Sequence, residues 1–373
     1  MSDLATYISS FETEPGYLDW AAFGPLSPRV RAESHADAEL MGTGRRSGID
    51  FVHGHVAAAR ESLAELLDAH VDDIVLQPST SYGLMQALYG VRGRVLVSRA
   101  EFPSLTVTAT RAAGLRDDLQ VQWMDPEAGF VTPQAVRSAL TDETTAVAVS
   151  LVDFRTGYLA DLTALREVIG DRLLIVDAIQ GFGVVDADYA AADVVCGNGY
   201  KWLRAARGTG WARFTERARE RIEPVLSGFA GTEVDLPVDA VPAAASTARA
   251  FTVTADDILA AGRLATALEE VRDAGVRAIA AAVADRADEI IATADRFGLT
   301  VVTPHERERR AGIVALAPEP TDAAALSAAL VNRGLTFTAR SGLVRLAAHA
   351  GTDQETLDLL SDALGAFVAE RSR

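Results

Sequence analysis

The stretch from Ile175 to Gly210, which begins IVDAIQGFG and ends GNGYKWLRAARGTG, decides the fold. It contains Lys201, the only lysine among the 35 lysine and arginine residues of the 373-residue chain. Arginine does not readily deprotonate and does not condense with an aldehyde, whereas a partly desolvated lysine can do both. Lys201 is therefore a candidate for covalent catalysis, unless it is a chance remnant in a composition that has drifted towards arginine.

The residues before Lys201 predict two strands that bring an acid and the lysine to the same edge of a sheet. The apolar run Leu173 to Val176 predicts a buried strand that ends at Asp177. A second predicted strand, residues 193–196, leads to the loop of Lys201. Ligands of open α/β sheets bind at the carboxyl ends of the strands. An acid and a lysine there meet the needs of pyridoxal phosphate, because the lysine forms the Schiff base and the acid keeps the pyridine nitrogen protonated.

The spacing of VDAIQ, GYKWL and GTG within residues 176–210 resembles the class V aminotransferase family of fold type I pyridoxal-phosphate enzymes. This family includes kynureninases, cysteine desulfurases and isopenicillin-N-epimerase-like proteins, and the resemblance covers nearly the whole chain. It implies an α/β fold whose large domain has a mostly parallel, seven-stranded type of sheet flanked by helices. The expected parts are an N-terminal segment (1–20) that packs with the small domain, a large cofactor-binding domain (21–245) and a smaller C-terminal α/β domain (246–373).

The cofactor phosphate is expected at PSTSYGLMQAL, where small hydroxyl residues open a helical pattern. Free N–H groups at a helix N-terminus bind anions, so Thr80 and Ser81 would hold the phosphate. The alternative is that these residues only cap the helix. In relatives, the positions of Asn198 and Tyr200 also contact the phosphate, and the loop of Thr209 reaches the phosphate of the partner subunit.

The ring of the cofactor is expected between Phe102 and Ile179. Many family members have His at the position of Phe102, and kynureninase-like members have Phe, which can stack on the ring. Phe102 could alternatively be an ordinary core residue. Gln180 can donate its amide to the phenolic oxygen, whereas Phe154 replaces an Asn that makes this contact in many relatives.

The substrate α-carboxylate is expected at Arg345, because RLAAH resembles an RxxPH-type motif of the family and a planar guanidinium suits a carboxylate. Ala348 replaces the Pro of that motif, and His349 either orients the loop or belongs to the core. Phe23 and Gly24 lie in a Gly- and Pro-rich segment that approaches the substrate in the family. The same segment could also be an ordinary linking turn.

The expected function is that of a class V aminotransferase-like enzyme acting on a small-molecule amino acid through Lys201, with Asp177 as the second catalytic residue. The alternatives are a carbon–sulfur or kynureninase-like carbon–carbon lyase, an epimerase, and a non-catalytic relative of the fold. Cysteine desulfurases need a nucleophilic Cys shortly before the substrate-binding Arg, and no Cys follows Cys196. The resemblance of the GTG loop also implies a homodimer.

The composition and the histidine spacing bear on the expected binding partners, cellular location and metal sites. A net charge of -17 and a pI near 4.8 disfavour binding to nucleic acid or to an anionic membrane. A single Cys excludes an intrachain disulfide, and no signal peptide or 18-residue apolar run is present, so a cytoplasmic location is expected. His53 and His55 are two residues apart and do not share a helix face, so no metal site is expected.

Overall fold

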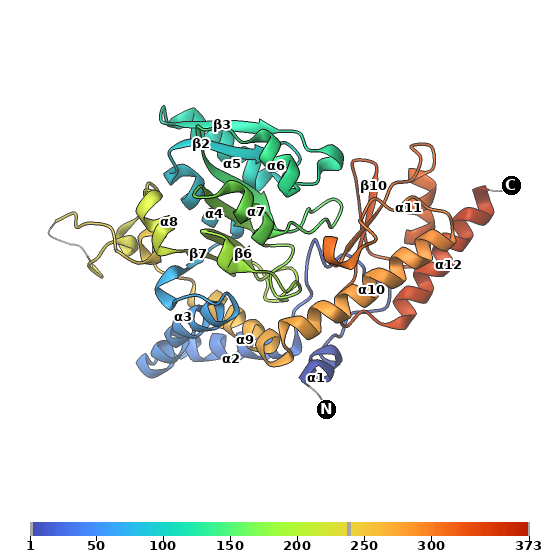
Figure 1. Cartoon of the computed structure of the whole chain (residues 1–373). Coiled ribbons are helices and arrows are strands. Elements are labelled where there is room, and N and C mark those ends of the chain that lie inside the picture. Colours follow the sequence, from blue (N-terminus) through green and yellow to red (C-terminus); the bar gives the residue numbers. More distant parts are fainter. Residues whose placement is uncertain (1–2, 237–239, 372–373) are drawn as a thin grey trace.

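The computed structural model describes residues 3–236 and 240–371 of the chain. A seven-stranded sheet with helices on both faces forms the larger part, and a three-stranded antiparallel sheet with its helices forms the smaller part (Figure 1). The predicted α/β architecture is confirmed. No helix among the described residues is long and apolar enough to cross a membrane.

The large sheet has the strand order β1-β7-β6-β5-β4-β2-β3. Only β7 is antiparallel to its neighbours, β1 and β6, so the sheet is mostly parallel as expected. The strands are β1 (Ile74–Gln77), β2 (Gly93–Ser98), β3 (Leu119–Met124), β4 (Thr144–Ser150), β5 (Leu173–Asp177), β6 (Val194–Asn198) and β7 (Gly210–Phe214).

The central strand β5 explains why the sheet is covered on both faces. All five of its residues are buried, and a parallel strand covered on both sides reads as a continuous apolar run. Leu173 and Ile175 pack with α4 and α5, whereas Leu174 and Val176 belong to the cluster that includes α6 and α7. The strand therefore ends inside the molecule, where it places Asp177.

The helices of the first 274 residues cover the sheet or form a layer beside it. They are α1 (Asp3–Ser9), α2 (Pro28–Gly42), α3 (Arg46–Leu66), α4 (Thr80–Gly90), α5 (Pro103–Leu115), α6 (Pro133–Ala139), α7 (Leu162–Ile169), α8 (Glu216–Arg221) and α9 (Ile258–Ala274). Short 3-10 turns are η1 (Val71–Asp73), η2 (Glu127–Gly129), η3 (Tyr189–Ala191), η4 (Phe229–Gly231), η5 (Ala248–Phe251) and η6 (Arg307–Arg309).

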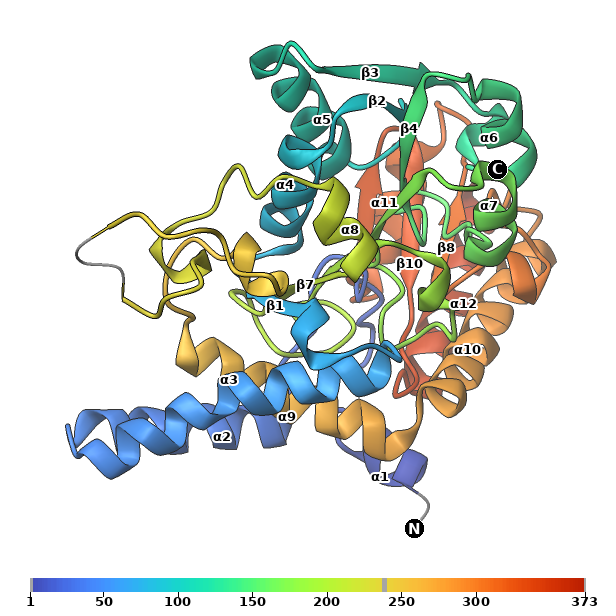
Figure 2. The same ribbon diagram turned by 60° about the vertical axis from the view of Figure 1, so that its left-hand side comes forward.

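The chain continues directly from α9 into a second long helix, α10 (Val276–Arg296). Gly275 separates them in a conformation with φ of 81°, which Gly adopts without strain. Helix α9 packs against α2 and α3, beneath the large sheet (Figure 2). Helix α10 instead runs to the smaller part, where it packs against α12 and β8.

The smaller part is a sheet of order β8-β10-β9 with helices on one side. Its elements are β8 (Ile313–Leu316), α11 (Ala323–Asn332), β9 (Thr338–Arg340), β10 (Leu343–Ala347) and α12 (Gln354–Arg371). Val301 adds an isolated bridge to Leu316 of β8.

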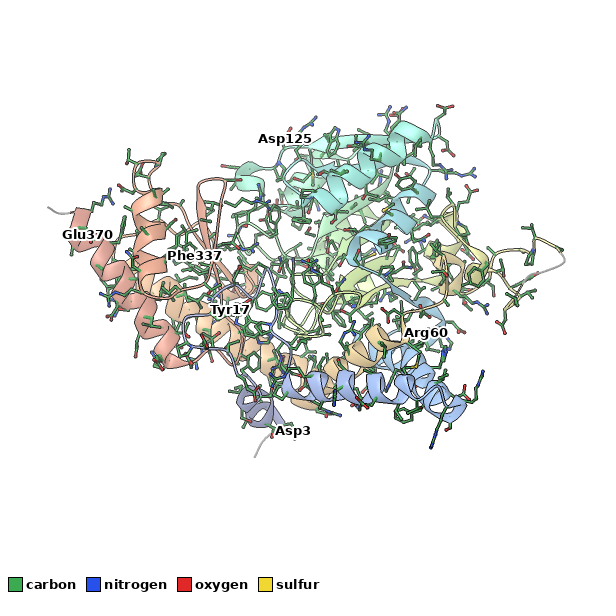
Figure 3. The ribbon with its side chains drawn as sticks, turned by 180° about the vertical axis from the view of Figure 1, so that it is seen from behind. Asp3, Tyr17, Arg60, Asp125, Phe337 and Glu370 are labelled. Carbon is green, nitrogen blue, oxygen red and sulfur yellow. The ribbon has the colours of Figure 1, made fainter. Side chains whose placement is uncertain are left out.

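The N-terminal segment joins the two parts. The N–H of Leu18 donates to the carbonyl of Thr336, and the N–H of Ala347 donates to the carbonyl of Leu18, at 2.9 and 2.7 Å. Tyr17 accordingly lies beside the segment that contains Phe337 (Figure 3). Leu18 belongs to the core of the smaller part, whereas Trp20 belongs to the main core. The domain limits at residues 20 and 245 stay predictions. Helix α9 falls inside the predicted C-terminal domain, but it packs against α2 and α3 beside the large sheet.

Candidate active site

Asp177 is held at the carboxyl end of β5 by the backbone that follows it. Its Oδ1 accepts a hydrogen bond from the N–H of Ile179 at 3.0 Å, and the side chain is buried. Burial raises the pKa of Asp177, while that hydrogen bond and the charge of Lys201 lower it. The carboxylate is therefore held in place and poised to pair with a cation.

Lys201 lies on a tight loop between β6 and β7. The loop is closed by backbone hydrogen bonds from Gly199 to Thr209 (3.0 Å) and from Ala205 to Gly199 (2.8 Å). Only 7% of Lys201 is exposed, and burial lowers the pKa of its amine, whereas the charge of Asp177 raises it. The lysine thus has the partly desolvated environment that covalent chemistry requires.

The N-terminal segment packs directly against the lysine loop. The N–H of Gly24 donates to the carbonyl of Tyr200 at 2.9 Å, and a Cβ on Gly24 would lie 1.8 Å from the carbonyl oxygen of Lys201. Only Gly can occupy this position without moving the loop. Phe23 is 42% exposed, and its carbonyl accepts a hydrogen bond from the Tyr17 hydroxyl.

Gln180 connects the same two segments. Its Nε2 donates to the carbonyl of Ala21 at 2.9 Å, and its Oε1 accepts from the Trp202 indole at 3.0 Å. One amide hydrogen therefore holds the N-terminal segment. The other is left for a ligand, because an amide nitrogen carries two hydrogens.

The start of α4 has the features of an anion site. Thr80 is buried, and its Oγ1 has no hydrogen-bond partner. The N-cap residue Ser79 makes no side-chain capping bond, and the Tyr82 N–H donates to the Ser79 carbonyl, so the N–H groups of Thr80 and Ser81 are the ones left for a ligand. A buried unpaired hydroxyl beside free N–H groups fits a phosphate. Ser81 bonds the Ser104 hydroxyl at 2.7 Å instead.

Asn198 ties the phosphate side of the site to the loop that follows Lys201. Its Oδ1 accepts hydrogen bonds from the N–H of Tyr200 at 3.1 Å and from the Thr209 hydroxyl at 3.2 Å. Gly210 passes so close to the start of α4 that a Cβ on it would lie 2.5 Å from backbone atoms of Ser79. The predicted residues Asn198, Tyr200 and Thr209 therefore form one connected group.

A cavity of about 610 Å³ lies between the two parts of the molecule, a size suited to a cofactor and a small ligand. Five of the predicted site residues line it. Arg345 comes from the smaller part, and the large part contributes Phe102, Gln180, Tyr200 and Lys201. Ala21 and Ala22 line it, whereas Phe23 and Gly24 do not. The substrate contacts predicted for Phe23 and Gly24 stay predictions.

Arg345 enters this cavity from β10 with part of its guanidinium unpaired. Its Nη1 donates to the carbonyl of Phe154 at 2.8 Å, and its Nη2 donates to the Thr338 hydroxyl at 3.3 Å. Asp19 lies 3.6 Å from Nη2 and is bonded to Thr338. The Nε of Arg345 is buried and has no partner, so a donor is left for a ligand carboxylate.

Phe102 and Phe154 contribute neighbouring aromatic rings to the cavity wall. Their rings meet edge to face at 5.0 Å, and the Lys201 amine lies 5.9 Å from the centre of the Phe102 ring. Phe102 is thus placed to cover a ring bound to the lysine loop. Phe154 offers no polar group from its side chain, in agreement with the contact expected to be missing.

Several residues of the site had no signal in the sequence. Asp19 and Thr338 meet Arg345 only in the fold, and nothing in their local sequence marks them. Glu101 precedes Phe102, and its carboxylate accepts hydrogen bonds from the Ser150 N–H at 3.0 Å and the Ser150 hydroxyl at 2.5 Å. Burial raises the pKa of Glu101 to about 7, and nearby Asp153 and Asp177 add to this.

His349 lies behind the lysine loop. Its Nε2 bonds the Trp202 carbonyl at 2.9 Å, and its Nδ1 accepts from the N–H of Ala350 at 2.8 Å, so Nε2 carries the proton. The ring is completely buried among aromatic side chains, and burial lowers its pKa to about 3. His349 therefore combines both predicted roles, since it orients the loop and belongs to the core.

A group of possible metal ligands lies away from this site. Glu33 and Asp37 are one turn apart on α2, and the Nε2 of His55 on α3 lies 3.3 and 3.0 Å from their carboxylates. A histidine ring N–H between the two carboxylates accounts for this arrangement. The spacing of His53 and His55, on which the prediction of no metal site was based, does not reveal the group.

Comparisons with known proteins agree with this geometry. The family model described as "Aminotransferase class-V" matches residues 17–344. The cysteine desulfurase IscS of Pseudomonas putida is 29% identical over 233 residues, and that of Pseudomonas aeruginosa is 30% identical over the same length. Each match covers 57% of this chain and only 57% of the relative.

Solved structures share the fold at low sequence identity. The enzyme C-DES with glycine covalently linked to its PLP cofactor superimposes with a TM-score of 0.85 at 17% identity, covering 95% of this chain and 97% of that one. A cysteine desulfurase from Thermococcus onnurineus gives 0.84 at 18%, covering 95% of each chain. Because the family model matches residues 17–344, most of the 373-residue chain, the chain belongs to the class V aminotransferase family of pyridoxal-phosphate-dependent enzymes.

Proposed function

We propose that the protein is a lyase that uses pyridoxal phosphate to cleave a bond at the β-carbon of an amino acid. The observation that carries this proposal is the convergence of Lys201 and Arg345 in one cavity that has no thiol among its lining residues. An amino acid held there by its carboxylate would present its α-carbon to the lysine.

The residues of the site fit the cofactor. The unpaired Thr80 hydroxyl, Ser81 and the N-terminus of α4 would hold the phosphate, with Asn198, Tyr200 and Thr209 behind them. Asp177 would pair with the pyridine nitrogen, and Gln180 would donate to the phenolic oxygen. Phe102 and Ile179 would cover the two faces of the ring. When bound, pyridoxal phosphate supplies an electron sink for the bond that breaks at the α-carbon.

Lys201 would transfer protons, and Arg345 would bind the substrate carboxylate. Because burial lowers the pKa of Lys201, its amine loses a proton more readily than an exposed lysine and can then accept the α-proton of the substrate. Arg345 would bind the carboxylate through its unpaired Nε, and Phe154 and Thr338 hold its other nitrogens in position. A fixed carboxylate determines which α-substituent faces the lysine.

Sulfur transfer through a protein thiol is a poor fit, although the curated relatives are named cysteine desulfurases. Cys196 is completely buried in β6, and burial raises the pKa of its thiol well above the usual range. No other Cys exists in the chain. A direct elimination needs no such thiol, and a neighbouring structure is described as the cystine C-S lyase C-DES with its product, cysteine persulfide.

Transamination is the second candidate, because the matching family model carries the name aminotransferase. The two reactions differ in their products. The experiment is to incubate the reconstituted holoenzyme with a panel of amino acids and to measure keto acid, ammonia and sulfide, with and without an added keto acid. Ammonia released without an added keto acid supports the lyase, whereas dependence on the added keto acid supports the aminotransferase.

Lys201→Ala tests the common basis of both candidates. The variant should lose turnover, and borohydride reduction should attach the cofactor to the wild-type peptide that contains Lys201 but not to the variant. Mass spectrometry of the digested proteins checks this. A wild-type protein that cannot be loaded with pyridoxal phosphate would contradict the proposal.

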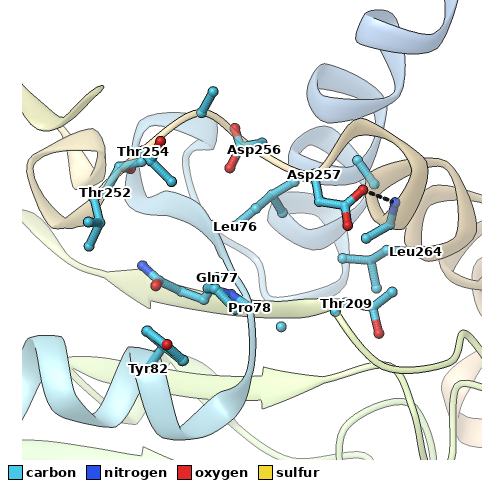
Figure 4. Close-up of a pocket in the computed structure, with 16 residues that line it drawn as sticks. Leu76, Gln77, Pro78, Tyr82, Thr209, Thr252, Thr254, Asp256, Asp257 and Leu264 are labelled. Atoms are coloured by element: carbon cyan, nitrogen blue, oxygen red, sulfur yellow. Dashed lines mark hydrogen bonds between the residues drawn. The ribbon is translucent and has the colours of Figure 1, made fainter. Parts of the chain in front are cut away.

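We also propose that the active unit is a homodimer. The loop Gly208–Gly210 lines a second cavity, of about 450 Å³, together with Tyr82 and residues 252–257 (Figure 4). Tyr82 is 48% exposed and Val253 is 46% exposed, so apolar side chains border this cavity. A second copy of the chain would cover them.

A further inference from the structure

The active-site cavity has more positive charge than one amino-acid carboxylate requires. Besides Lys201 and Arg345, its wall contains Arg99, Arg155 and Arg340, while Glu101 is the only acid among the lining residues that the structure describes. Arg99 stacks on Trp123 and lies 3.4 Å from the exposed Asp125. Its charge therefore has a partner outside the cavity. Arg155 is also paired, with Asp153, which does not line the cavity, so Arg155 offers a spare donor and the uncompensated charge is that of Arg340.

Arg155 is held in place with one edge of its guanidinium unused. Its Nη2 donates to the Oδ2 of Asp153 at 2.7 Å, and Asp153 also accepts from the backbone N–H groups of Arg155 and Thr156. A Cβ on Gly129 would lie 2.4 Å from Nη2, so the 129 backbone supports the group from behind. No hydrogen bond from Nη1 is present among the described residues. Arg155 is thus oriented before any ligand arrives.

Arg340 reaches the cavity from the other part of the molecule. It ends β9, and a two-residue turn with φ values of 52° at Ser341 and 79° at Gly342 returns the chain to Leu343. Such tight turns hold the ends of a hairpin in a defined position. Within residues 3–236 and 240–371, Arg340 has no acidic partner, and its charge contributes to lowering the pKa of Arg345. An unpaired arginine beside the carboxylate-binding arginine favours a further anion.

We propose that Arg155 and Arg340 form a second anion subsite, so that the preferred substrate is an amino acid with an acidic group on its side chain. This inference rests on the proposed function, because Arg345 must already hold the α-carboxylate. Guanidinium groups bind carboxylates and other oxyanions strongly through charge-assisted hydrogen bonds. The two arginines come from different parts of the molecule, so an acidic side chain would also bridge them.

The test compares acids with their neutral isosteres on the holoenzyme. Aspartate, asparagine, glutamate and glutamine are titrated while the visible spectrum of the bound pyridoxal phosphate is followed. At least one acid should bind about ten-fold or more tightly than its amide, the effect expected of one charge-assisted hydrogen bond. Added salt should weaken the binding of the acid more than that of the amide.

Arg340→Gln should reduce the preference for the acid about ten-fold, and Arg155→Gln should act in the same direction. Arg333→Gln is the matched control, because Arg333 is exposed at the end of α11 and does not line the cavity. Equal affinity of the wild type for acids and amides would overturn the subsite alone. An equal loss for acid and amide in Arg340→Gln would also overturn it. A holoenzyme that responds to no amino acid would overturn the proposed function, and the subsite with it.

Discussion

Asp177 and Lys201 stabilise each other's charge in a place where either charge alone would be costly. Burial raises the pKa of the acid and lowers that of the amine, and the attraction between them opposes both shifts. A cofactor with a cationic ring nitrogen would replace Lys201 as the partner of Asp177. The amine would then be free to exchange protons.

Asp177→Asn should retain the shape of the site but lose on the order of a hundredfold or more in kcat, because a neutral amide does not hold a proton on the pyridine nitrogen. Steady-state kinetics measure the loss, and the visible absorbance of the bound cofactor shows whether the variant is still loaded. Asp186→Asn is the matched control, since Asp186 is exposed and pairs with Arg277 on the surface. Turnover near that of the wild type would mean that another group serves the ring nitrogen.

Only some of the individual residues of the site can be predicted from the sequence. Lys201 and Asp177 could be predicted because one is the only lysine and the other ends an apolar strand. Asp19 and Thr338 could not, because they contact Arg345 across large distances in the chain and neither belongs to a local pattern. The unpaired Thr80 hydroxyl also becomes visible only when its surroundings are known.

Among the elements, strands with continuous apolar runs were predictable and those without them were not. The strands predicted at residues 173–176 and 193–196 are present in the large sheet as β5 and β6. The antiparallel direction of β7 and the packing of α9 on α2 and α3 had no local signal. Strand direction depends on the connection between strands, and helix packing depends on faces that only the fold brings together.

His349 links three elements: β10, the lysine loop and the N-terminal segment. It contacts Tyr7, Phe11 and Trp20 through its ring and Trp202 through both its ring and its Nε2. Its pKa in the folded protein, about 3, is below the ordinary value of 6.5. The unfolded chain therefore takes up a proton below pH 6.5 that the folded protein does not bind, and stability is lost as the pH falls from there towards 3.

Lowering the pH from 7 to 5 should consequently cost the wild type about 2 kcal/mol more than it costs His349→Gln. Thermal unfolding of both proteins across this range measures the difference. Gln can still donate to the Trp202 carbonyl, but it does not titrate. His70→Gln is the control, because the His70 side chain is 72% exposed. Parallel pH profiles for the wild type and His349→Gln would show that acid lability arises elsewhere.

At the scale of the whole molecule, the candidate site depends on three separate segments of the chain. The large part contributes Asp177 and Lys201, of which only Lys201 lines the cavity. The smaller part contributes Arg345, and the N-terminal segment contributes Asp19 and the carbonyl of Ala21. A cavity built in this way changes shape if the two parts move relative to each other. Arg345 is tied to the large part through the carbonyl of Phe154. Binding of a carboxylate at Arg345, as proposed, would therefore be coupled to the position of the smaller part.

The proposed homodimer would cover the apolar border of the second cavity. Val253 borders the second cavity and is 46% exposed, and Val331 on α11 is 62% exposed but does not line that cavity. We expect the wild type to have twice the chain mass of 39.5 kDa. Val253→Glu should shift it towards the monomer, because an unpaired carboxylate is costly to bury at an interface.

Val331→Glu adds the same charge at a surface site and should leave the mass unchanged. Light scattering at several protein concentrations measures the mass, and cofactor absorbance after gel filtration measures retention of pyridoxal phosphate. Because the loop Gly208–Gly210 lies both beside the second cavity and next to the start of α4, loss of the dimer should also weaken cofactor retention. A fully active wild-type monomer would refute the proposed assembly, and equal effects of the two Glu variants would mean that the interface lies on another face.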